Sequence, residues 1–161
     1  MQDTILTGTE QAFIAPARRA VLATIRPDGT ARLVPICFVL AEAADDLGRA
    51  LIYSPLDDKP KASADPHDLG RVRDLLAVPS ATILVDRWSE DWAGLGWIRL
   101  SGRAKILEPG LEDREEHAAA VGMLRAKYPQ YADHDLPGRP IIRIAIDRIQ
   151  RWGDVTGSAG A

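Results

Sequence analysis

The stretch from Trp97 to Leu107 is the part of the sequence that most constrains the fold. Polar and apolar side chains alternate strictly along it: the polar set is Arg99, Ser101, Arg103 and Lys105, and the apolar set is Ile98, Leu100, Ala104 and Ile106. Because successive side chains of a strand point to opposite faces, this pattern predicts a β-strand with one buried face. Gly102, in the middle, predicts a bulge or a close approach of backbone or ligand.

Shorter apolar segments separated by turn residues predict five further strands. They cover residues 20–26, 31–40, 50–54, 81–86 and a last segment that contains Ile142, Ile144 and Ile146. The turn Pro27-Asp28-Gly29 predicts a hairpin between the first two, with Gly29 supplying a positive φ. In the last strand the alternation slips at Asp147-Arg148 before Ile149, which predicts a bulge.

Helical signals lie between these strands. Thr9 predicts the N-cap of a short helix that carries Phe13 and Ile14 and is disrupted by Pro16. A second helix is expected over residues 69–78, stopped by Pro79, and an amphipathic third over residues 112–127. About six strands with two or three inserted helices predict a mainly β protein, an antiparallel barrel with helical decoration. The 161 residues form one domain, because the chain has no repeat or linker.

The predicted strand over residues 31–40 has a further implication. Its apolar residues run almost continuously instead of alternating, so both of its faces should be covered. In a small barrel this means core on one side and a partner subunit on the other. We therefore expect a homodimer.

Composition narrows the partners and the location. A net charge of −3 gives no footprint for nucleic acid, and no apolar run approaches the roughly 18 residues that span a bilayer. The N-terminal segment lacks the features of a secretory signal, so the expected location is the cytoplasm. Cys37 is the one cysteine, which excludes an intrachain disulfide and two-cysteine metal sites.

The usual catalytic motifs are missing. There is no nucleophile elbow, no zinc-protease motif, no phosphate-binding Walker loop and no C-x-x-C pair. His117 is in phase with the apolar stripe of its helix and is expected to be structural, whereas His67 and His134 read as exposed loop residues. This pattern fits either a redox enzyme whose cofactor carries the chemistry or a pure binding module.

Four segments in order resemble the split-barrel family that includes pyridoxamine-phosphate oxidases and deazaflavin-dependent reductases. They are LATIRPDGTARLVPI (22–36), YSPLDDKPK (53–61), LGRVRDLLAVPSATILVD (69–86) and WIRLSGRAKIL (97–107). The resemblance implies a six-stranded antiparallel split β-barrel with two or three inserted helices. The loop around Lys59 and Lys61, with Asp91-Trp92 and Trp97-Ile98-Arg99, is most similar to the bacterial branch associated with coenzyme F420.

The resemblance also implies where a cofactor would bind. Its phosphate would meet Lys59 and Lys61, with Arg32 on a neighbouring strand, because an anion needs positive charge there. The other implied cofactor contacts are Val34, Pro35, Ile36, Tyr53, Ser54, Trp97, Arg99 and Trp152. Plainer roles stay open: a solvated loop for the lysines, an ion pair for Arg99, barrel core for residues 34–36 and surface anchoring for the tryptophans.

The family's pyridoxamine-phosphate oxidases end in an arginine- and histidine-bearing motif, and this chain has neither residue after Trp152. The departure argues against that activity. The sequence therefore favours a coenzyme F420-dependent oxidoreductase that acts on a small organic substrate by hydride transfer. The alternatives are an FMN-dependent oxidase or reductase and a non-catalytic protein that binds flavin or deazaflavin.

Overall fold

A computed structural model describes residues 5–56 and 65–159. Its strands and α-helices are, in chain order, α1 (Gly8–Ile14), β1 (Ala20–Ile25), β2 (Ala31–Ile36), β3 (Val39–Leu40), β4 (Leu51–Pro55), α2 (Gly70–Ala77), β5 (Ser80–Arg87), β6 (Gly96–Leu107), α3 (Arg114–Lys127) and β7 (Ile141–Gly153). Short 3-10 turns lie between them at η1 (Pro66–Asp68), η2 (Trp92–Gly94) and η3 (Pro129–Asp133). None of the helices within the described ranges is long and apolar enough to cross a membrane.

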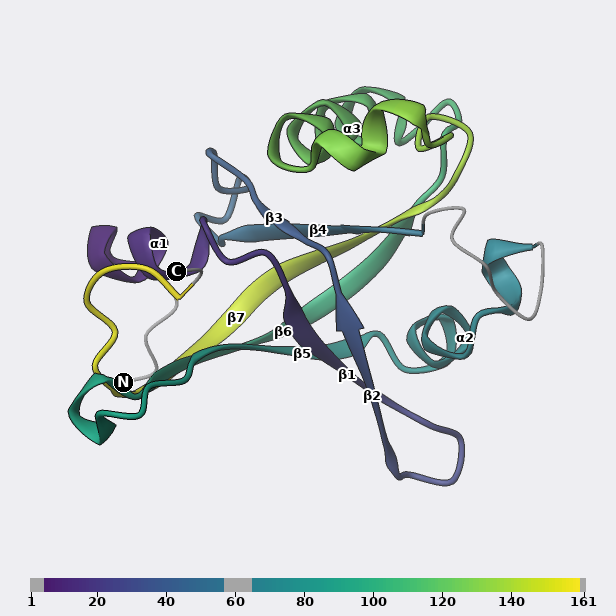
Figure 1. Cartoon of the computed structure of the whole chain (residues 1–161). Coiled ribbons are helices and arrows are strands. Elements are labelled where there is room, and N and C mark those ends of the chain that lie inside the picture. The colour runs from purple at the N-terminus through teal and green to yellow at the C-terminus, as the bar shows by residue number, and fades with distance from the viewer. Residues whose placement is uncertain (1–4, 57–64, 160–161) are drawn as a thin grey trace.

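All strands belong to one antiparallel sheet in the order β2-β1-β5-β6-β7-β4-β3, which curls into a split barrel (Figure 1). The predicted strand over residues 31–40 is in fact two strands, so the sheet has seven strands where the sequence predicts six. β2 pairs with β1 at one edge of the sheet, and β3 pairs with β4 at the other edge. Only Cys37 and Phe38 separate the end of β2 from the start of β3. The chain therefore turns a corner there and joins the two edges of the curled sheet.

Side chains satisfy the backbone groups at this corner. The Tyr128 hydroxyl accepts from the Phe38 N–H at 3.0 Å, and the Ser54 hydroxyl donates to the Cys37 carbonyl at 2.8 Å. Because these backbone groups leave the sheet ladder, partners of this kind are required where the corner is buried. Periodicity alone misses such a corner, because its side chains are as apolar as those of a strand.

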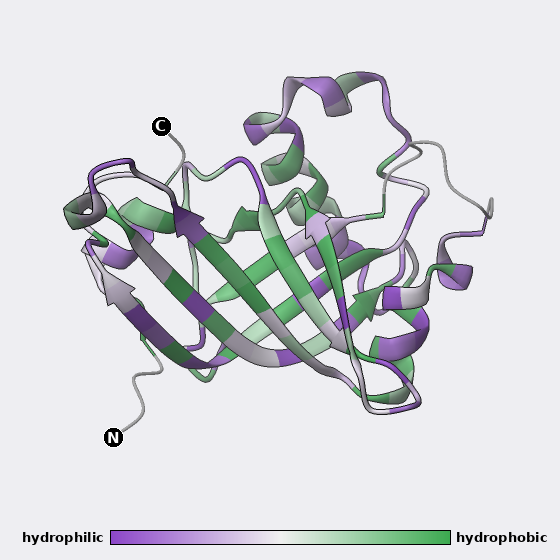
Figure 2. Cartoon of the chain, turned by 60° about the horizontal axis from the view of Figure 1, so that its bottom comes forward, coloured by the Kyte–Doolittle hydropathy of each residue, from purple (hydrophilic) through white to green (hydrophobic). Residues whose placement is uncertain are grey.

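The core lies inside the curl of the sheet. Its largest members are fully buried residues of the inner strand faces and of α1, among them Phe13, Leu22, Ile83, Leu100 and Ile144. Along the long strands hydrophobic and hydrophilic positions alternate, as Figure 2 shows. A second buried cluster lies on the other side of β4 and β7, where α3 covers Tyr53, Leu107 and Ile141.

The bulge predicted from the sequence is present where β6 meets β7. Ser101 pairs with Arg148 and Gly102 pairs with Ile146, so Asp147 is the extra residue. A Cβ on Gly102 would lie 2.0 Å from the Ala145 carbonyl oxygen, which explains the glycine in an otherwise regular strand. The hairpin turn is confirmed as well, with Gly29 at φ +82°.

One local prediction is wrong. The helix α1 is capped by Thr7 and not by Thr9: the Thr7 hydroxyl accepts from the Glu10 N–H, and the Glu10 carboxylate accepts from the Thr7 N–H. This reciprocal capping box satisfies two N-terminal donors, whereas Thr9 lies inside the helix. The sequence T-x-x-E at positions 7–10 carried that signal.

Candidate functional site

The outer face of the sheet is open along β2, β1, β5, β6 and the second half of β7. Strand pairing places its side chains in two rows, which are Pro35–Val21–Leu84–Arg99–Gln150 and Leu33–Ala23–Thr82–Ser101–Arg148. Leu33 is 65% exposed. The β2 side of this face is therefore apolar and the β6–β7 side is basic.

Two tryptophans and an arginine meet at the basic side. Trp97 of β6 lies directly opposite Trp152 of β7, and Trp152 is 54% exposed. The Arg99 guanidinium carbon lies 5.3 Å from the centre of the Trp97 ring, and the guanidinium donates two hydrogen bonds, at 3.0 and 2.8 Å, to the Gln150 Oε1. We call Trp97, Arg99, Arg148, Gln150 and Trp152 the outer-face site.

The arginines of this face have no carboxylate partner among the described residues. Arg99, Arg103 and Arg148 are exposed on the same face, and none forms an ion pair with a carboxylate of the described residues. Like charges on neighbouring strands repel each other, so a row of this kind costs stability unless an anion lies across it. The arrangement suits a flat ring against the tryptophans and an anionic group beside the arginines.

Arg32 is held in a different way, at the end of the barrel that α2 closes. Its Nε donates to the Asp74 Oδ2 at 2.7 Å, and the same oxygen accepts from the Thr24 hydroxyl at 2.7 Å. The hydrogen bond from Arg32 is the main reason why the pKa of Asp74 lies below its ordinary value, against the opposing effect of burial. Asp74 is buried, so it fixes where the guanidinium lies.

The guanidinium lies against the first residue of α2. A Cβ on Gly70 would be 2.5 Å from the Arg32 Cζ, so a side chain at position 70 would displace the guanidinium. This helix has no acidic residue in its first turn and no side-chain cap, so the positive end of its dipole adds to the charge of Arg32. Asp74 already pairs with this guanidinium, so an anion that binds here would share Arg32 with that carboxylate.

The remaining predicted cofactor contacts have separate positions. Pro35 is exposed on the outer face, Val34 is half-buried on the inner face, and Ile36 belongs to the core. Ser54 is buried at the corner described above. Tyr53 is buried under α3, where its hydroxyl donates to the Glu116 Oε1 at 2.8 Å and burial raises its pKa. Lys59 and Lys61 lie outside the described residues.

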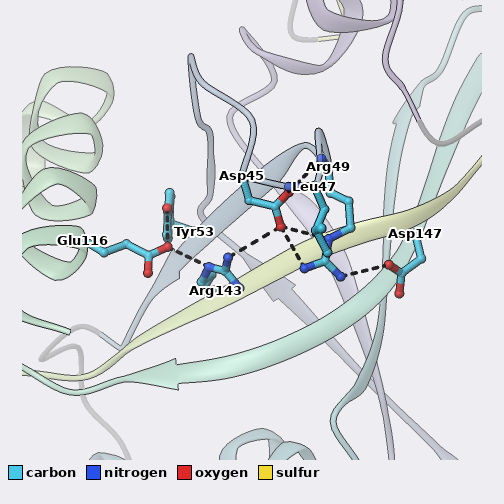
Figure 3. Close-up of polar contacts among 7 residues, drawn as sticks. All are labelled: Asp45, Leu47, Arg49, Tyr53, Glu116, Arg143 and Asp147. Carbon is cyan, nitrogen blue, oxygen red and sulfur yellow. Dashed lines mark hydrogen bonds and ion pairs between the residues drawn. The ribbon is translucent and has the colours of Figure 1, made fainter. Parts of the chain in front are cut away.

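Sequence reasoning missed a chain of charged groups next to Tyr53 (Figure 3). Glu116 is bound by the Arg143 Nε at 2.6 Å, Arg143 lies 3.9 Å from Asp45, and Arg49 bridges Asp45 to Asp147 at 2.8 and 3.4 Å. Asp45, Glu116 and Arg143 border a shallow pocket of about 410 Å³ between α3 and the β3–β4 connection. They come from separate parts of the chain, so no local motif announces them. Each of these charged groups has an opposite charge beside it, so we assign the network a structural role.

His117 has the structural role predicted for it. It is 3% exposed, and its Nε2 lies 2.6 Å from the Arg139 carbonyl oxygen. His67 is partly exposed in η1, and its ring lies between two carboxylates.

The sequence profile of the family described as pyridoxamine 5′-phosphate oxidase matches residues 6–153. No curated protein matches the chain at a significant level.

Solved structures share the fold at low sequence identity. The conserved hypothetical protein Rv2991 from Mycobacterium tuberculosis is 20% identical over 94% of this chain and 87% of its own, with a TM-score of 0.64. The heme storage protein HutZ from Vibrio cholerae is 12% identical over 92% of each chain, with a TM-score of 0.61. An F420 reductase is 17% identical over 91% of this chain and 98% of its own, with a TM-score of 0.58. At these identities the likenesses establish the fold alone.

Proposed function

The chain belongs to the pyridoxamine 5′-phosphate oxidase family, and on this basis we propose that it is an oxidoreductase that uses the deazaflavin coenzyme F420. When bound, the deazaflavin ring supplies hydride chemistry toward a small organic substrate. The observation that carries the proposal is the outer-face site, where Trp97 and Trp152 lie opposite each other beside the unneutralised Arg99 and Arg148.

The protein's own residues would bind and orient the cofactor. The tryptophans offer flat apolar surface to a ring, and Arg99 is already oriented by Trp97 and Gln150. Because this guanidinium is held before a ligand arrives, less conformational freedom is lost on binding. Arg32, positioned by Asp74 at the start of α2, would hold the phosphate together with Lys59 and Lys61.

The number of cations favours coenzyme F420 over FMN. FMN carries one phosphate, whereas the deazaflavin carries a phosphate and a tail of glutamate carboxylates. Three arginines lie along β6 and β7, which is more positive charge than one phosphate group needs: Arg99, Arg103 and Arg148. FMN remains the alternative cofactor, and a non-catalytic flavin or deazaflavin carrier remains the alternative function.

The outer face also supports a homodimer with the cofactor between subunits. Leu33 and Pro35 are exposed on β2, in the rows that lead across the sheet to Arg148 and Arg99. A second copy of the chain that covers this face would bury the apolar side and exclude water from the basic side. Each cofactor site would then contain residues of both chains.

A haem-binding function has less support from two of the three histidines, His67 and His117. Haem iron in proteins is commonly held by a histidine. The Nε2 of His117 is engaged with a carbonyl, and both ring nitrogens of His67 face carboxylates. Neither His117 nor His67 therefore offers a ring nitrogen without a hydrogen-bond partner to a haem iron.

Turnover distinguishes the enzyme from the carrier. The purified protein is mixed with reduced coenzyme F420 and a panel of small carbonyl, alkene, nitro and quinone acceptors, and loss of the reduced cofactor is followed by absorbance. We expect protein-dependent oxidation with at least one acceptor. Tight cofactor binding without turnover of any acceptor would instead favour the carrier. We expect no conversion of pyridoxamine phosphate by the FMN-loaded protein, and efficient conversion would contradict the proposal.

A further inference from the structure

The imidazole of His67 joins two segments that are far apart in the sequence. Its Nδ1 lies 2.9 Å from Oδ1 of Asp65, the N-cap residue of η1, and its Nε2 lies 2.7 Å from Oε1 of Glu108, which follows β6. Both distances are those of charge-assisted hydrogen bonds. The ring therefore connects η1 to the end of β6 through two carboxylates.

This geometry is fully satisfied only when each ring nitrogen carries a proton. A neutral imidazole has one N–H, so one of its nitrogens would turn a lone pair toward a carboxylate. The imidazolium donates to both. In agreement with the geometry, the hydrogen bonds to Glu108 and then to Asp65 raise the pKa of His67 above 6.5, while burial opposes the rise.

The charged surroundings of His67 are mostly acidic. Asp65 and Asp68 lie on its own segment, and Glu108 faces it from the end of β6. Behind Glu108, the Asp113 carboxylate accepts from the Glu108 N–H at 3.2 Å and binds the Lys105 ammonium. The first turn of α2 adds Arg71. Loss of the His67 charge would remove the cation that lies between Asp65 and Glu108.

The segment that His67 holds leads directly into α2. The 3-10 turn ends at Asp68, Leu69 caps α2, and Gly70 carries the Arg32 guanidinium against its backbone. We propose that protonated His67 is a pH-sensitive latch that fastens η1 and the start of α2 to the end of β6. Any effect of the latch on cofactor affinity rests on the proposed function, but the latch itself does not.

The direction of the pH dependence follows from linkage. A histidine whose pKa is raised in the folded protein contributes stability that is fully present below its ordinary pKa and is lost as the pH rises through the raised value. The latch is therefore closed in mildly acidic solution. It opens as the pH rises through the raised pKa of His67.

The test uses the full chain without cofactor. The His67 ring protons are titrated by NMR, and hydrogen-exchange protection factors of the α2 amides are measured between about pH 6 and about pH 9, corrected for intrinsic exchange. The variants are Glu108→Gln, which keeps an acceptor but removes the charge, and His67→Gln. Glu112→Gln, an exposed acid near the start of α3, is the matched control.

We expect His67 to titrate above 6.5 in the wild type and at lower pH in Glu108→Gln. In the wild type the hydrogen-exchange protection factors of the α2 amides should fall as the pH rises. The largest possible fall is the ratio of the acid dissociation constant of His67 in the unfolded chain to that in the folded chain. In His67→Gln this fall should be absent, and Glu112→Gln should behave as the wild type. Titration of wild-type His67 at or below 6.5, or the same pH response of α2 in all variants, would overturn the latch. Because cofactor is absent, either outcome leaves the proposed function untouched.

Discussion

Arg32 of β2 and Asp74 of α2, 42 residues apart in the chain, are joined by a hydrogen bond of 2.7 Å between Nε and Oδ2. The same carboxylate binds the buried Thr24 hydroxyl, so one buried acid fastens the first hairpin to α2. Arg32, which the family resemblance implies as a phosphate contact, is therefore held in place by the Asp74 carboxylate. Its position at the start of a helix, against Gly70, is set by that bond.

Replacing Asp74 should destabilise the protein. Asp74→Ala removes the acceptor of both Thr24 and Arg32, and a buried polar group left unsatisfied costs about 1–3 kcal/mol. Urea denaturation at neutral pH measures the loss, with the exposed Asp133→Ala as control. Because the pKa of Asp74 is lowered, its contribution is present above the ordinary pKa of 3.8 and shrinks as the pH falls through the lowered value. Equal stabilities of Asp74→Ala and Asp133→Ala would refute this role.

The bulge between β6 and β7 should not tolerate a side chain at Gly102. In Gly102→Ala the new Cβ would lie 2.0 Å from a backbone oxygen, which must move. We expect a loss of stability of about 1–3 kcal/mol or more. Gly110→Ala is the matched control, because its Cβ would meet nothing within 4 Å. Indistinguishable denaturation midpoints for the two variants would show that the bulge is more adaptable than this contact implies.

The outer face should be the dimer interface. Leu33 is 65% exposed on that face, and Leu33→Asp would place a charge in the contact between two copies. We expect the wild type to be a dimer at micromolar concentration and Leu33→Asp to be a folded monomer by light scattering. Leu111→Asp, at a residue that is 95% exposed outside this face, should remain dimeric. A monomeric wild type would remove the support for an intersubunit site.

Lys59 and Lys61 should bind the cofactor phosphate. Only Pro60 separates the two lysines in the sequence, and a phosphate needs positive charge. A charge-assisted hydrogen bond contributes about 1.5–3 kcal/mol, so Lys59→Ala and Lys61→Ala should each raise the dissociation constant roughly ten- to a hundredfold. Lys105→Ala is the control, because its charge is already paired with Asp113. The two substitutions should weaken binding of the phosphorylated cofactor more than binding of its dephosphorylated analogue. Equal losses of affinity for the two ligands would show that the lysines do not bind the phosphate.

The local elements were predictable because their signals lie in short stretches. Alternation in β6, the slip before Ile149 and Gly29 in the first turn each depend on neighbouring residues alone. The corner at Cys37-Phe38 was not predictable in this way. Its stabilising partners, Tyr128 and Ser54, are distant in the sequence, and its apolar side chains continue the pattern of the strand before it.

The same limit applies to the candidate site. The family resemblance implied Trp97, Arg99 and Trp152 among the cofactor contacts, and strand pairing brings these three together on one face. It did not reveal that Tyr53 is bound to Glu116 under α3 or that Arg32 is bound to Asp74, because both partners are on helices far along the chain. Arg148 also went unnoticed, since the bulge at Asp147 decides which face it occupies.

The central claim is that the outer-face site binds a deazaflavin, and direct titration tests it. Coenzyme F420 and FMN are titrated separately into the wild type, into Arg99→Ala, and into Arg114→Ala as an exposed control of equal charge on α3. We predict saturable quenching of deazaflavin fluorescence by the wild type and by Arg114→Ala, weaker binding of FMN, and a roughly tenfold or greater loss of F420 affinity in Arg99→Ala. Absence of saturable binding of both cofactors to the folded wild-type protein would contradict the account.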